Sequence, residues 1–329
     1  MTTSLTRQRL VELLDQSREK RITVIGDAML DVYLTGDVDR ISPEAPVPVV
    51  RVRARKNALG GAANVAQNVV AVGAHCELVA ATGRDTAGAV LRELLSEMGV
   101  NAGSLVEVSR CTTQKTRIVA RSQQLVRIDE EEDADLEAND VDRLLDAVRR
   151  AVSTADAVVL EDYNKGVLIR AVIREAIDAA NDRKVPVIVD PKYRNFFEFR
   201  GATVFKPNRR ELESALGAAF DLARPDTLPA VLEQLGIQHM LITLGEHGMA
   251  LVDANGTVDS LPTVARHVYD VVGAGDTVTA YLATLLAAGA NVREAAAIAN
   301  IAAGIEVGKL GAATVTSTEL LEYFDTHEL

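Results

Sequence analysis

The sequence predicts an α/β fold, with a mainly parallel central sheet flanked by helices and a small β-sheet lid. Short runs of β-branched and aliphatic residues alternate with helical patterns along most of the 329 residues, as in βαβ units. Polar residues follow several of these runs, where the strands of a parallel sheet end. Two segments, at about 33–57 and 111–130, lack a helical period and alternate like strands. We expect one domain over residues 1–329, with these two insertions forming the lid.

The composition argues against a nucleic-acid or membrane partner. The net charge is −12, there is no Trp and aromatic residues make up 4%, so surfaces for stacking bases are not expected. The N-terminus has no signal-type apolar run, and the most apolar stretch, around 278–290, is shorter than a membrane span. Two cysteines are too few for a disulfide framework. We therefore expect a cytoplasmic protein.

The first third of the chain begins with an amphipathic helix over residues 4–19, followed by a buried strand from Arg21 to Gly26. Ligands of open α/β sheets bind beyond the carboxyl ends of the strands. Asp27 and Asp31 follow this strand, so we expect them to accept hydrogen bonds from ligand hydroxyls. The alternative is a turn Asp followed by an exposed Asp.

The two lid segments carry cations at alternate positions. Because side chains alternate along a strand, Arg51, Arg53 and Arg55 are predicted to share one face of the first lid segment. The cations of the second lid segment are likewise predicted to share one strand face. The cations of the second segment are Lys115, Arg117 and Arg121. Such faces are either solvated or in contact with an anionic substrate. The acidic run from 129 to 140 is interpreted as a solvated connection.

A helix begins at Gly60, Gly61 and Asn64 and continues to Gly73. Paired glycines allow another group to approach closely, and Asn64 either contacts that group or caps the helix. Further strands and helices then alternate. The strands are expected over 75–81, 156–161, 185–190, 203–206 and 239–244, and the helices over 86–98, 140–152 and 168–181.

Polar clusters follow three of these strands, which indicates one cleft at their carboxyl ends. The clusters contain Asp162, Tyr163 and Lys165, then Asp190, Lys192 and Tyr193, then Asn208 and Glu211. A glycine turn with Thr243, Gly245 and Gly248 follows the next strand. The phosphate-binding motif G-x-x-x-x-G-K-[ST] and a strand-linked G-x-G-x-x-G are both absent from the sequence, and no histidine pair has zinc-ligand spacing.

The stretch from Asp270 to Thr277 predicts a glycine turn that opens a helix over 277–288. The first amides of a helix have no intrahelical acceptor, so the turn of Gly273, Ala274 and Gly275 is able to bind an anion. Asp276 beside that anion is suited to deprotonate an attacking hydroxyl; the alternative is a glycine turn with Asp276 as a cap. An Ala-rich helix over 292–306 follows, and it ends in a turn from Gly308 to Gly311.

Four ordered motifs resemble those of the ribokinase-like carbohydrate kinases. They are Gly60–Ala66, Asn208-x-x-Glu211, Thr243-Leu-Gly245-x-x-Gly248 and Asp270–Asp276. Within this family, three further segments are similar to bacterial heptose 7-phosphate kinases of lipopolysaccharide core synthesis. These segments are Arg40–Val49, Thr113–Arg117 and Asp162–Gly166. Since many members carry a nucleotidyltransferase domain after the kinase and this chain ends at Leu329, the resemblance is to the separate, monofunctional kinase.

The resemblance implies a single kinase domain that transfers the ATP γ-phosphoryl group to the anomeric hydroxyl of D-glycero-D-manno-heptose 7-phosphate, a step toward ADP-heptose. It implies Asp276 as the base, and the amides of Gly273, Ala274, Gly275 and Asp276 as the phosphoryl site. Asn208 and Glu211 would position Mg²⁺, partly through water. Val271 and Val272 stand where many relatives have Thr after the Asp, which leaves a monovalent-cation site open.

Two further groups of residues would border the substrates. Those expected at the nucleotide are Thr243, Gly245, Gly248, Asn300, Gly308 and Gly311, and those expected at sugar hydroxyls are Asp27, Asp31, Gly61 and Asn64. The substrate phosphate needs cations, for which the candidates are Lys165, Lys192, Arg194, Lys115, Arg117 and Arg53, with Asp162 beside them.

Two alternatives stay open at this point. The first is a kinase for another sugar or sugar phosphate, of the phosphofructokinase or ribokinase type, because few contacts decide the substrate. The second is a non-catalytic sugar-phosphate sensor on the same fold. We also expect a homodimer through the lid sheet, since a small sheet has exposed edges and Val47, Val49 and Ile118 give it an apolar character.

Overall fold

A computed structural model describes residues 5–121, 123–222, 228–265, 268–309, 311 and 313–326. Its central sheet has nine strands in the order β13-β12-β11-β10-β9-β8-β1-β4-β5. All neighbours from β11 to β5 are parallel, and β12 and β13 are antiparallel additions at one edge. The strands are β1 (Arg21–Gly26), β4 (His75–Gly83), β5 (Leu105–Val108), β8 (Ala157–Glu161), β9 (Val187–Asp190), β10 (Val204–Phe205), β11 (His239–Thr243), β12 (Met249–Asp253) and β13 (Val258–Leu261). The mainly parallel sheet predicted from the sequence is confirmed.

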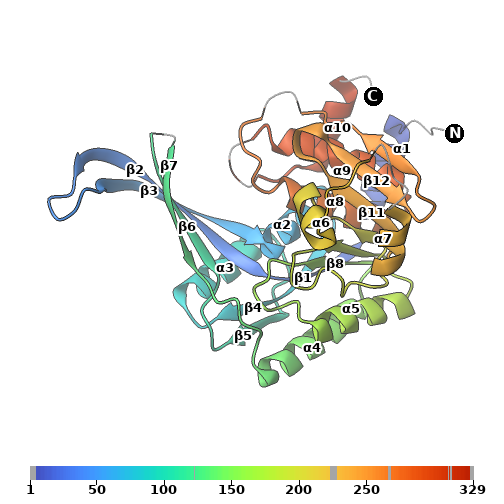
Figure 1. Cartoon of the computed structure of the whole chain (residues 1–329), viewed down its shortest axis with the longest axis horizontal. Helices are drawn as coiled ribbons and strands as arrows, with labels where there is room; N and C mark the ends of the chain where they lie inside the picture. Colours follow the sequence, from blue (N-terminus) through green and yellow to red (C-terminus); the bar gives the residue numbers. More distant parts are fainter. Residues whose placement is uncertain are drawn as a thin grey trace.

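Helices cover both faces of this sheet (Figure 1). One core contains side chains of α1 (Arg7–Ser17), α2 (Ala62–Val72), α8 (Ala274–Ala287), α9 (Val292–Glu306) and α10 (Ser317–Thr326). The other contains side chains of α4 (Ala138–Val152), α5 (Arg170–Asp182), α6 (Arg209–Leu216) and α7 (Leu228–Leu235). Between the two cores, all five residues of β8 are buried, which explains its continuous apolar run before Glu161.

Apolar periodicity accounts for how the helices pack. In α4 the buried residues Leu144, Ala147, Val148 and Ala151 form one stripe at helical spacing, and charged residues occupy the opposite side. The remaining helix, α3 (Thr86–Glu97), begins at Asp85, whose side chain accepts a hydrogen bond from the Gly88 amide. Across the described residues, no helix has the length and apolar character needed to cross a bilayer.

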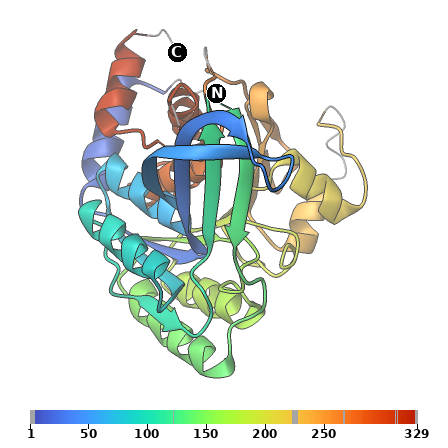
Figure 2. The ribbon, with the colours of Figure 1, turned by 90° about the vertical axis from the view of Figure 1, so that its left-hand side faces the viewer.

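A separate four-stranded sheet forms the lid and projects from the body of the molecule (Figures 1 and 2). Its order is β3-β2-β6-β7, with strands β2 (Ala28–Ile41), β3 (Pro48–Gly61), β6 (Gln114–Ala120) and β7 (Gln123–Glu130). The β2–β6 pair is parallel, and the other two pairs are antiparallel. β2 starts directly after Asp27 and β3 ends at Gly61, so this sheet extends beyond residues 33–57.

Two details of the predicted cationic faces are wrong. The ladder of β2 and β3 passes from the Thr35–Ala54 pair to the Gly36–Val52 pair, so Arg53 is an extra residue in a β-bulge. The bulge interrupts the alternation that the sequence predicted along β3. Arg121 lies in the β6–β7 turn with a φ of 49°, outside the strand that carries Lys115 and Arg117.

Candidate active site

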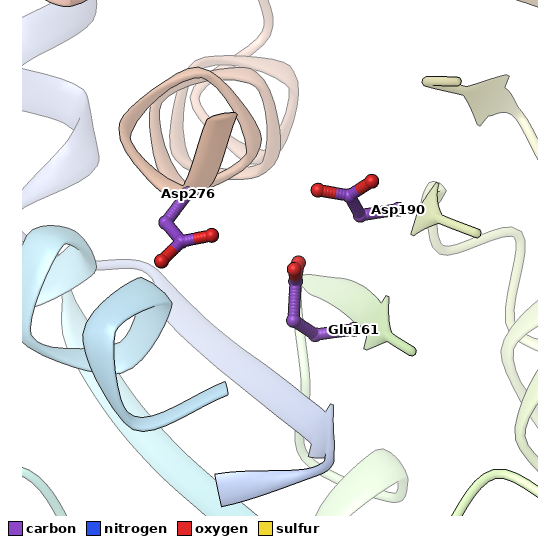
Figure 3. A group of neighbouring side chains, drawn as sticks. All are labelled: Glu161, Asp190 and Asp276. Carbon is purple, nitrogen blue, oxygen red and sulfur yellow. The ribbon is translucent and has the colours of Figure 1, made fainter. Parts of the chain in front are cut away.

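Three carboxylates meet at the carboxyl ends of the central strands (Figure 3). Glu161 ends β8, Asp190 ends β9, and Asp276 lies in the first turn of α8. Glu161 and Asp190 are paired in the parallel register of β8 and β9, so their side chains point to the same side of the sheet. One oxygen from each of the three residues lies within 4.8 Å of the others, and all three residues are buried.

Asp276 is held by hydrogen bonds from two other segments. Asn64, in the first turn of α2, donates from Nδ2 to Oδ2 at 2.6 Å, and the Tyr163 hydroxyl donates to Oδ1 at 3.1 Å. Burial raises the pKa of Asp276 to about 6, and the charge of Asp190 adds to this effect. The carboxylate is therefore both fixed in orientation and more basic than an exposed Asp, as a general base requires.

Glu161 is the most buried carboxylate of this cluster. It is fully buried, and neither of its carboxylate oxygens has a hydrogen-bond partner among the described residues. Burial, together with the charges of Asp190 and Asp276, raises the pKa of Glu161 well above its ordinary value. Lys206 contributes an opposing positive charge: it is buried, and its Nζ lies 2.7 Å from Asp190 Oδ2.

The N-terminus of α8 opens toward the same cluster. Gly273 precedes the helix with a φ of 98°, a conformation that favours glycine. Gly275 approaches the cluster closely, because a Cβ atom at this position would lie 3.5 Å from Lys206 Nζ and 3.8 Å from Asp190 Oδ2. The first-turn amides of α8, which lack intrahelical acceptors, and the Lys206 ammonium together favour an anion here.

A cavity of about 480 Å³ adjoins this helix start. Its volume is within the usual range of small-molecule sites. Among its lining residues are the expected nucleotide residues Thr243, Gly245, Gly248 and Asn300, together with Ala274 and Gly275 of the phosphoryl turn. Asn300 also donates to the Pro262 carbonyl at 2.7 Å. Gly308 and Gly311 follow α9, and the Gly311 amide donates to Asp270 Oδ2 at 3.2 Å, on the loop before α8.

The residues expected at sugar hydroxyls lie on the other side of Asp276, where β2 and β3 leave the body. A Cβ added to Gly60 would lie 2.8 Å from Asp31 Oδ2, so the glycine backbone runs directly beside this carboxylate. Asp31 also accepts a hydrogen bond from Arg117. Gly61 precedes α2 with a φ of 56°, which brings Asn64 to Asp276.

Asp27 has a structural contact that the sequence did not predict. Its carboxylate accepts backbone hydrogen bonds from Tyr163, Lys165 and Val167, at 2.8, 2.9 and 3.1 Å. The loop after β8 is thus wrapped around Asp27, and this loop carries Tyr163 to Asp276. Asp162 is buried in the same loop and accepts from the Asn164 amide; burial raises the pKa of Asp162 to about 7.

The predicted phosphate-binding cations all have partners in this structure. Lys192 pairs with Glu211 and lies 5.3 Å from the Tyr163 ring centre; Arg117 pairs with Asp31, and the exposed Arg53 with Asp37. The Arg194 guanidinium donates to the Asp133 carbonyl. Lys115 lies 3.3 Å from Glu131, and Lys165 lies 2.9 Å from the same carboxylate.

The acidic run from 129 to 140 is exposed along most of its length, as expected of a solvated connection, but part of it also forms ion pairs that were not predicted. Asp129, Glu131 and Asp133 contact Lys115 and Lys165, and one oxygen of Glu131 is buried. An incoming phosphate would have to replace these carboxylates.

Asn208 and Glu211 form a capping box at the start of α6. The Asn208 side chain accepts from the Glu211 amide, and the Glu211 side chain accepts from the Asn208 amide, both at 2.8 Å. Asn208 also forms a parallel bridge with Thr243, which joins this motif to the nucleotide turn. Both are oxygen ligands of the type that Mg²⁺ prefers, although Glu211 also binds Lys192.

Four residues of the cluster were not selected as site residues from the sequence. Asp190 and Tyr163 belong to strand-end clusters that the sequence did identify, so their positions carried a signal. In the sequence, Glu161 is the last residue of a predicted buried strand, and Lys206 is the last residue of another predicted strand. A charged residue inside a continuous apolar run is rarely buried without a reason, and this signal could have identified both.

Comparisons with known proteins agree with this geometry. A profile described as pfkB family carbohydrate kinase matches residues 19–319. The bifunctional protein HldE of Rhodospirillum rubrum is 46% identical over 315 residues, covering 95% of this chain and 64% of the relative. The bifunctional protein HldE of Caulobacter vibrioides is 48% identical over 305 residues, covering 92% of this chain and 62% of the relative. The chain thus spans less than two thirds of the length of these relatives.

Solved structures share the fold. Ribokinase of Arabidopsis thaliana, complexed with ribose and ATP, superposes with a TM-score of 0.73 at 21% identity, over 92% of this chain and 98% of that chain. Phosphofructokinase-2 of Escherichia coli, in complex with potassium, superposes with a TM-score of 0.76 at 19% identity, over 94% and 99%. The ribokinase-like fold expected from the four motifs is confirmed.

Proposed function

The chain belongs to the pfkB family of carbohydrate kinases, and on this premise we propose that it transfers the γ-phosphoryl group of ATP to the anomeric hydroxyl of D-glycero-D-manno-heptose 7-phosphate. The product is heptose 1,7-bisphosphate, on the route to ADP-heptose and the lipopolysaccharide core. The use of ATP fits a cytoplasmic reaction.

The position of Asp276 carries the proposal for phosphoryl transfer. Its carboxylate lies between the glycine turn of α8 and Asn64, which donates a 2.6 Å hydrogen bond to it. Asp276 takes the proton of the attacking hydroxyl, and the first amides of α8 stabilise the charge on the transferring phosphoryl group. Lys206, which is buried beside Gly275, adds a positive charge at the same place.

The nucleotide occupies the cavity of about 480 Å³ that adjoins Gly275. Thr243, Gly245, Gly248 and Asn300 line it, and we propose that Gly308 and Gly311, after α9, border the nucleotide. The Arabidopsis ribokinase, which shares this fold, was solved with ribose and ATP. Asp27, Asp31, Gly61 and Asn64 face the sugar on the other side of Asp276.

Mg²⁺ belongs to the proposal as the ion that neutralises phosphate charge when bound. Asn208 and Glu211 hold it, partly through water, because their direct contacts are those of the capping box and of Lys192. A monovalent cation is a second ion to test. The Asp270 carboxylate, on the loop that carries Val271 and Val272, accepts from the amides of Val272 and Gly311, and the Escherichia coli phosphofructokinase-2 neighbour was solved in complex with potassium.

The choice of heptose 7-phosphate rests on three segments that resemble heptose 7-phosphate kinases. Two of them meet the candidate site: Asp162–Gly166 carries Tyr163 to Asp276, and Thr113–Arg117 carries Arg117 to Asp31. Lys165, Lys192, Lys115, Arg117, Arg194 and Arg53 are the proposed cations for the substrate phosphate. The third segment, Arg40–Val49, lies at the far end of the lid hairpin.

A panel of acceptors tests the substrate. ADP release should show the largest kcat/KM for D-glycero-D-manno-heptose 7-phosphate, and ³¹P NMR should detect a new phosphate on C1. A higher kcat/KM for fructose 6-phosphate or ribose would support the alternative sugar kinase. Sugar-phosphate binding without ADP release for any acceptor would support a sensor and contradict the proposed activity.

A homodimer through the lid sheet is part of the same proposal. All eight residues of β7 are exposed, and large apolar side chains are exposed on the lid, including Val47, Val52, Val126 and Ile128. A second copy that covers this sheet would remove apolar surface from water and pair its edge. Light scattering should give twice the chain mass for the wild type and a monomer for Ile128→Glu; a wild-type monomer at assay concentration would contradict the dimer.

A further inference from the structure

Glu131 joins the lid to the body of the molecule through two lysines. Its Oε2 atom lies 3.3 Å from Nζ of Lys115, on β6 of the lid, and its Oε1 atom lies 2.9 Å from Nζ of Lys165, in the loop after β8. β6 and β8 belong to different sheets (Figure 1). One carboxylate thus bridges two ammonium groups with separate oxygens, which is also how a phosphate group would bind them.

This bridge is largely shielded from solvent, but its hydrogen bonding is incomplete. The side chains of Lys115, Lys165 and Glu131 are 15, 12 and 22% exposed. Oε2 of Glu131 is buried and has no hydrogen-bond partner among the described residues, so its contact with Lys115 is one of charge alone. Buried polar atoms are normally hydrogen-bonded. The carboxylate is therefore a poorer partner for these lysines than a group whose oxygens accept hydrogen bonds from both.

The bridged lysines lie beside residues that are proposed to face the sugar. Lys115 is paired with Asp31 in the parallel register of β2 and β6, so both side chains lie on the same side of the lid sheet. The Lys165 amide donates a 2.9 Å hydrogen bond to the Asp27 carboxylate. A sugar bound by Asp27 and Asp31 would therefore lie next to the residues that Glu131 bridges.

The Glu131 side chain can leave the bridge without disturbing the lid sheet. The ladder of β6 and β7 ends at the pair of Gln114 and Glu130, so Glu131 is the first residue beyond it. The backbone after it is held separately, because Arg110 donates a 2.7 Å hydrogen bond to the Ala134 carbonyl. Rotation of the Glu131 side chain would thus free both lysines while the strands and the backbone stay in place.

We propose that Glu131 is an internal competitor, which occupies Lys115 and Lys165 until a phosphate group replaces it. The inference rests on the proposed function, in which these lysines bind the phosphate of the acceptor. A phosphate monoester carries a charge of about −1.5 to −2 at pH 7 and three acceptor oxygens, more than the single charge and two oxygens of a carboxylate. A phosphate group therefore displaces Glu131, whereas a neutral sugar leaves the bridge in place.

The competition acts most strongly against free anions. Inorganic phosphate has to displace Glu131 without other contacts. The phosphate of a bound sugar phosphate is held near the lysines at a high effective concentration, because Asp27 and Asp31 bind the sugar. The bridge therefore lowers occupation of the lysines by free phosphate more than occupation by the acceptor.

Calorimetry with inorganic phosphate, in the absence of ATP, tests the inference. Glu131→Gln keeps the size of the side chain but removes its charge, so the affinity for phosphate should rise about tenfold, the scale of one charge-assisted hydrogen bond. Glu132→Gln is the matched control, because it removes the same charge from the next residue, whose exposed side chain accepts from the Cys111 amide. This control should leave the affinity for phosphate unchanged.

A double variant shows whether the gain arises at the bridge. Phosphate that binds at the glycine turn of α8 would not depend on Glu131 or Lys165. The gain should therefore be lost in Glu131→Gln combined with Lys165→Ala. Thermal unfolding without phosphate shows whether each variant is folded, and Glu131→Ala, which removes both carboxylate oxygens, should give the same gain as Glu131→Gln.

Two results would overturn the inference. One is a folded Glu131→Gln protein with the wild-type affinity for phosphate, and the other is a gain that persists without Lys165. Neither measurement involves phosphoryl transfer, which the acceptor panel measures separately. Highest activity with a neutral sugar would contradict the proposed substrate, whereas an unchanged phosphate affinity would contradict the role of Glu131.

Discussion

Asn64 donates a 2.6 Å hydrogen bond to Asp276 across 212 residues of sequence. The contact exists because α2 and α8 both begin with a glycine at positive φ, Gly61 and Gly273, and their first turns meet. A carboxylate held by Asn64 and Tyr163 is fixed toward one side of the glycine turn. The predictions below follow from this arrangement and from the groups around it.

Replacing the base should remove turnover without removing the site. Asp276→Asn keeps the shape of the side chain but cannot accept a proton, so kcat should fall at least about 10²-fold. Binding of ATP and of the sugar phosphate, measured by calorimetry, should persist. An Asn variant with normal kcat would refute the role of Asp276.

Tyr163 should adjust the pH dependence of the same base. The pKa of Asp276 is raised to about 6 by burial, so activity should decline as the pH falls through this value and Asp276 becomes protonated. Tyr163→Phe removes a donor that stabilises the carboxylate, and the acid limb of kcat/KM should move upward by about one pH unit. An unchanged profile with reduced kcat would mean that Tyr163 acts only on packing.

Replacing Gly275 by alanine should lower the activity without lowering the stability of the fold. An added methyl group makes only ordinary contact, at 3.5 Å from Lys206 Nζ, and Ala is favoured over Gly in a helix by about 1 kcal/mol. Gly275→Ala should therefore keep or raise the Tm. Because the methyl group occupies the approach to Lys206 and Asp190, kcat should fall on the order of tenfold or more.

Gly273→Ala is the informative comparison for that experiment. Gly273 has a φ of 98°, so a side chain there should cost about 1–2 kcal/mol of folding free energy. Denaturant titrations should show this loss for Gly273→Ala but not for Gly275→Ala. Equal destabilisation of both variants would mean that the loss of activity reflects backbone strain.

Substrate-phosphate binding should depend on Lys165. Its ammonium group lies 2.9 Å from Glu131 and also contacts Asp133, and it becomes available to a phosphate if both carboxylates move away. Lys165→Ala should raise the KM for the sugar phosphate about tenfold, as for loss of one charge-assisted hydrogen bond, with little change in the KM for ATP. Lys56→Ala, at an exposed position of β3, should change neither value. A KM for the sugar phosphate that does not change in Lys165→Ala would remove this residue from the phosphate site.

Glu306 should make stability depend on pH. Burial, together with the charge of Asp270, raises its pKa from 4.5 to about 8, so the folded protein binds this proton more tightly than the unfolded chain. The free energy of unfolding should therefore decrease as the pH rises from about 4.5 to about 8. Glu306→Gln should remove this part of the pH dependence, and its gain over the wild type should grow between pH 5 and pH 9, to the order of a few kcal/mol. A constant difference in urea titrations at both pH values would contradict the shift.

Local sequence signals predicted much of the fold. The Ala-rich pattern predicted a helix over 292–306, and the structure places α9 at Val292–Glu306. The glycine turn and the helix that follows it were also located from their residues. Helices α6, α7 and α10 were not predicted. In α6 and α10, Leu212 and Leu320 are the only buried described residues, so the apolar periodicity is weak. α7 has eight residues, four of them buried, and is too short to show a helical period clearly.

What the sequence by itself determined is most of the elements, their order and the motifs at strand ends, because periodicity and glycine placement depend on neighbouring residues only. Which charges face one another was decided by the tertiary structure. The register of β8 and β9 brings Glu161 beside Asp190, and the meeting of α2 and α8 brings Asn64 to Asp276. Likewise, the acidic run was predicted to be solvated, but folding carries Glu131 to Lys115 and Lys165. Such contacts depend on distances between elements far apart in the chain, and no local pattern encodes them.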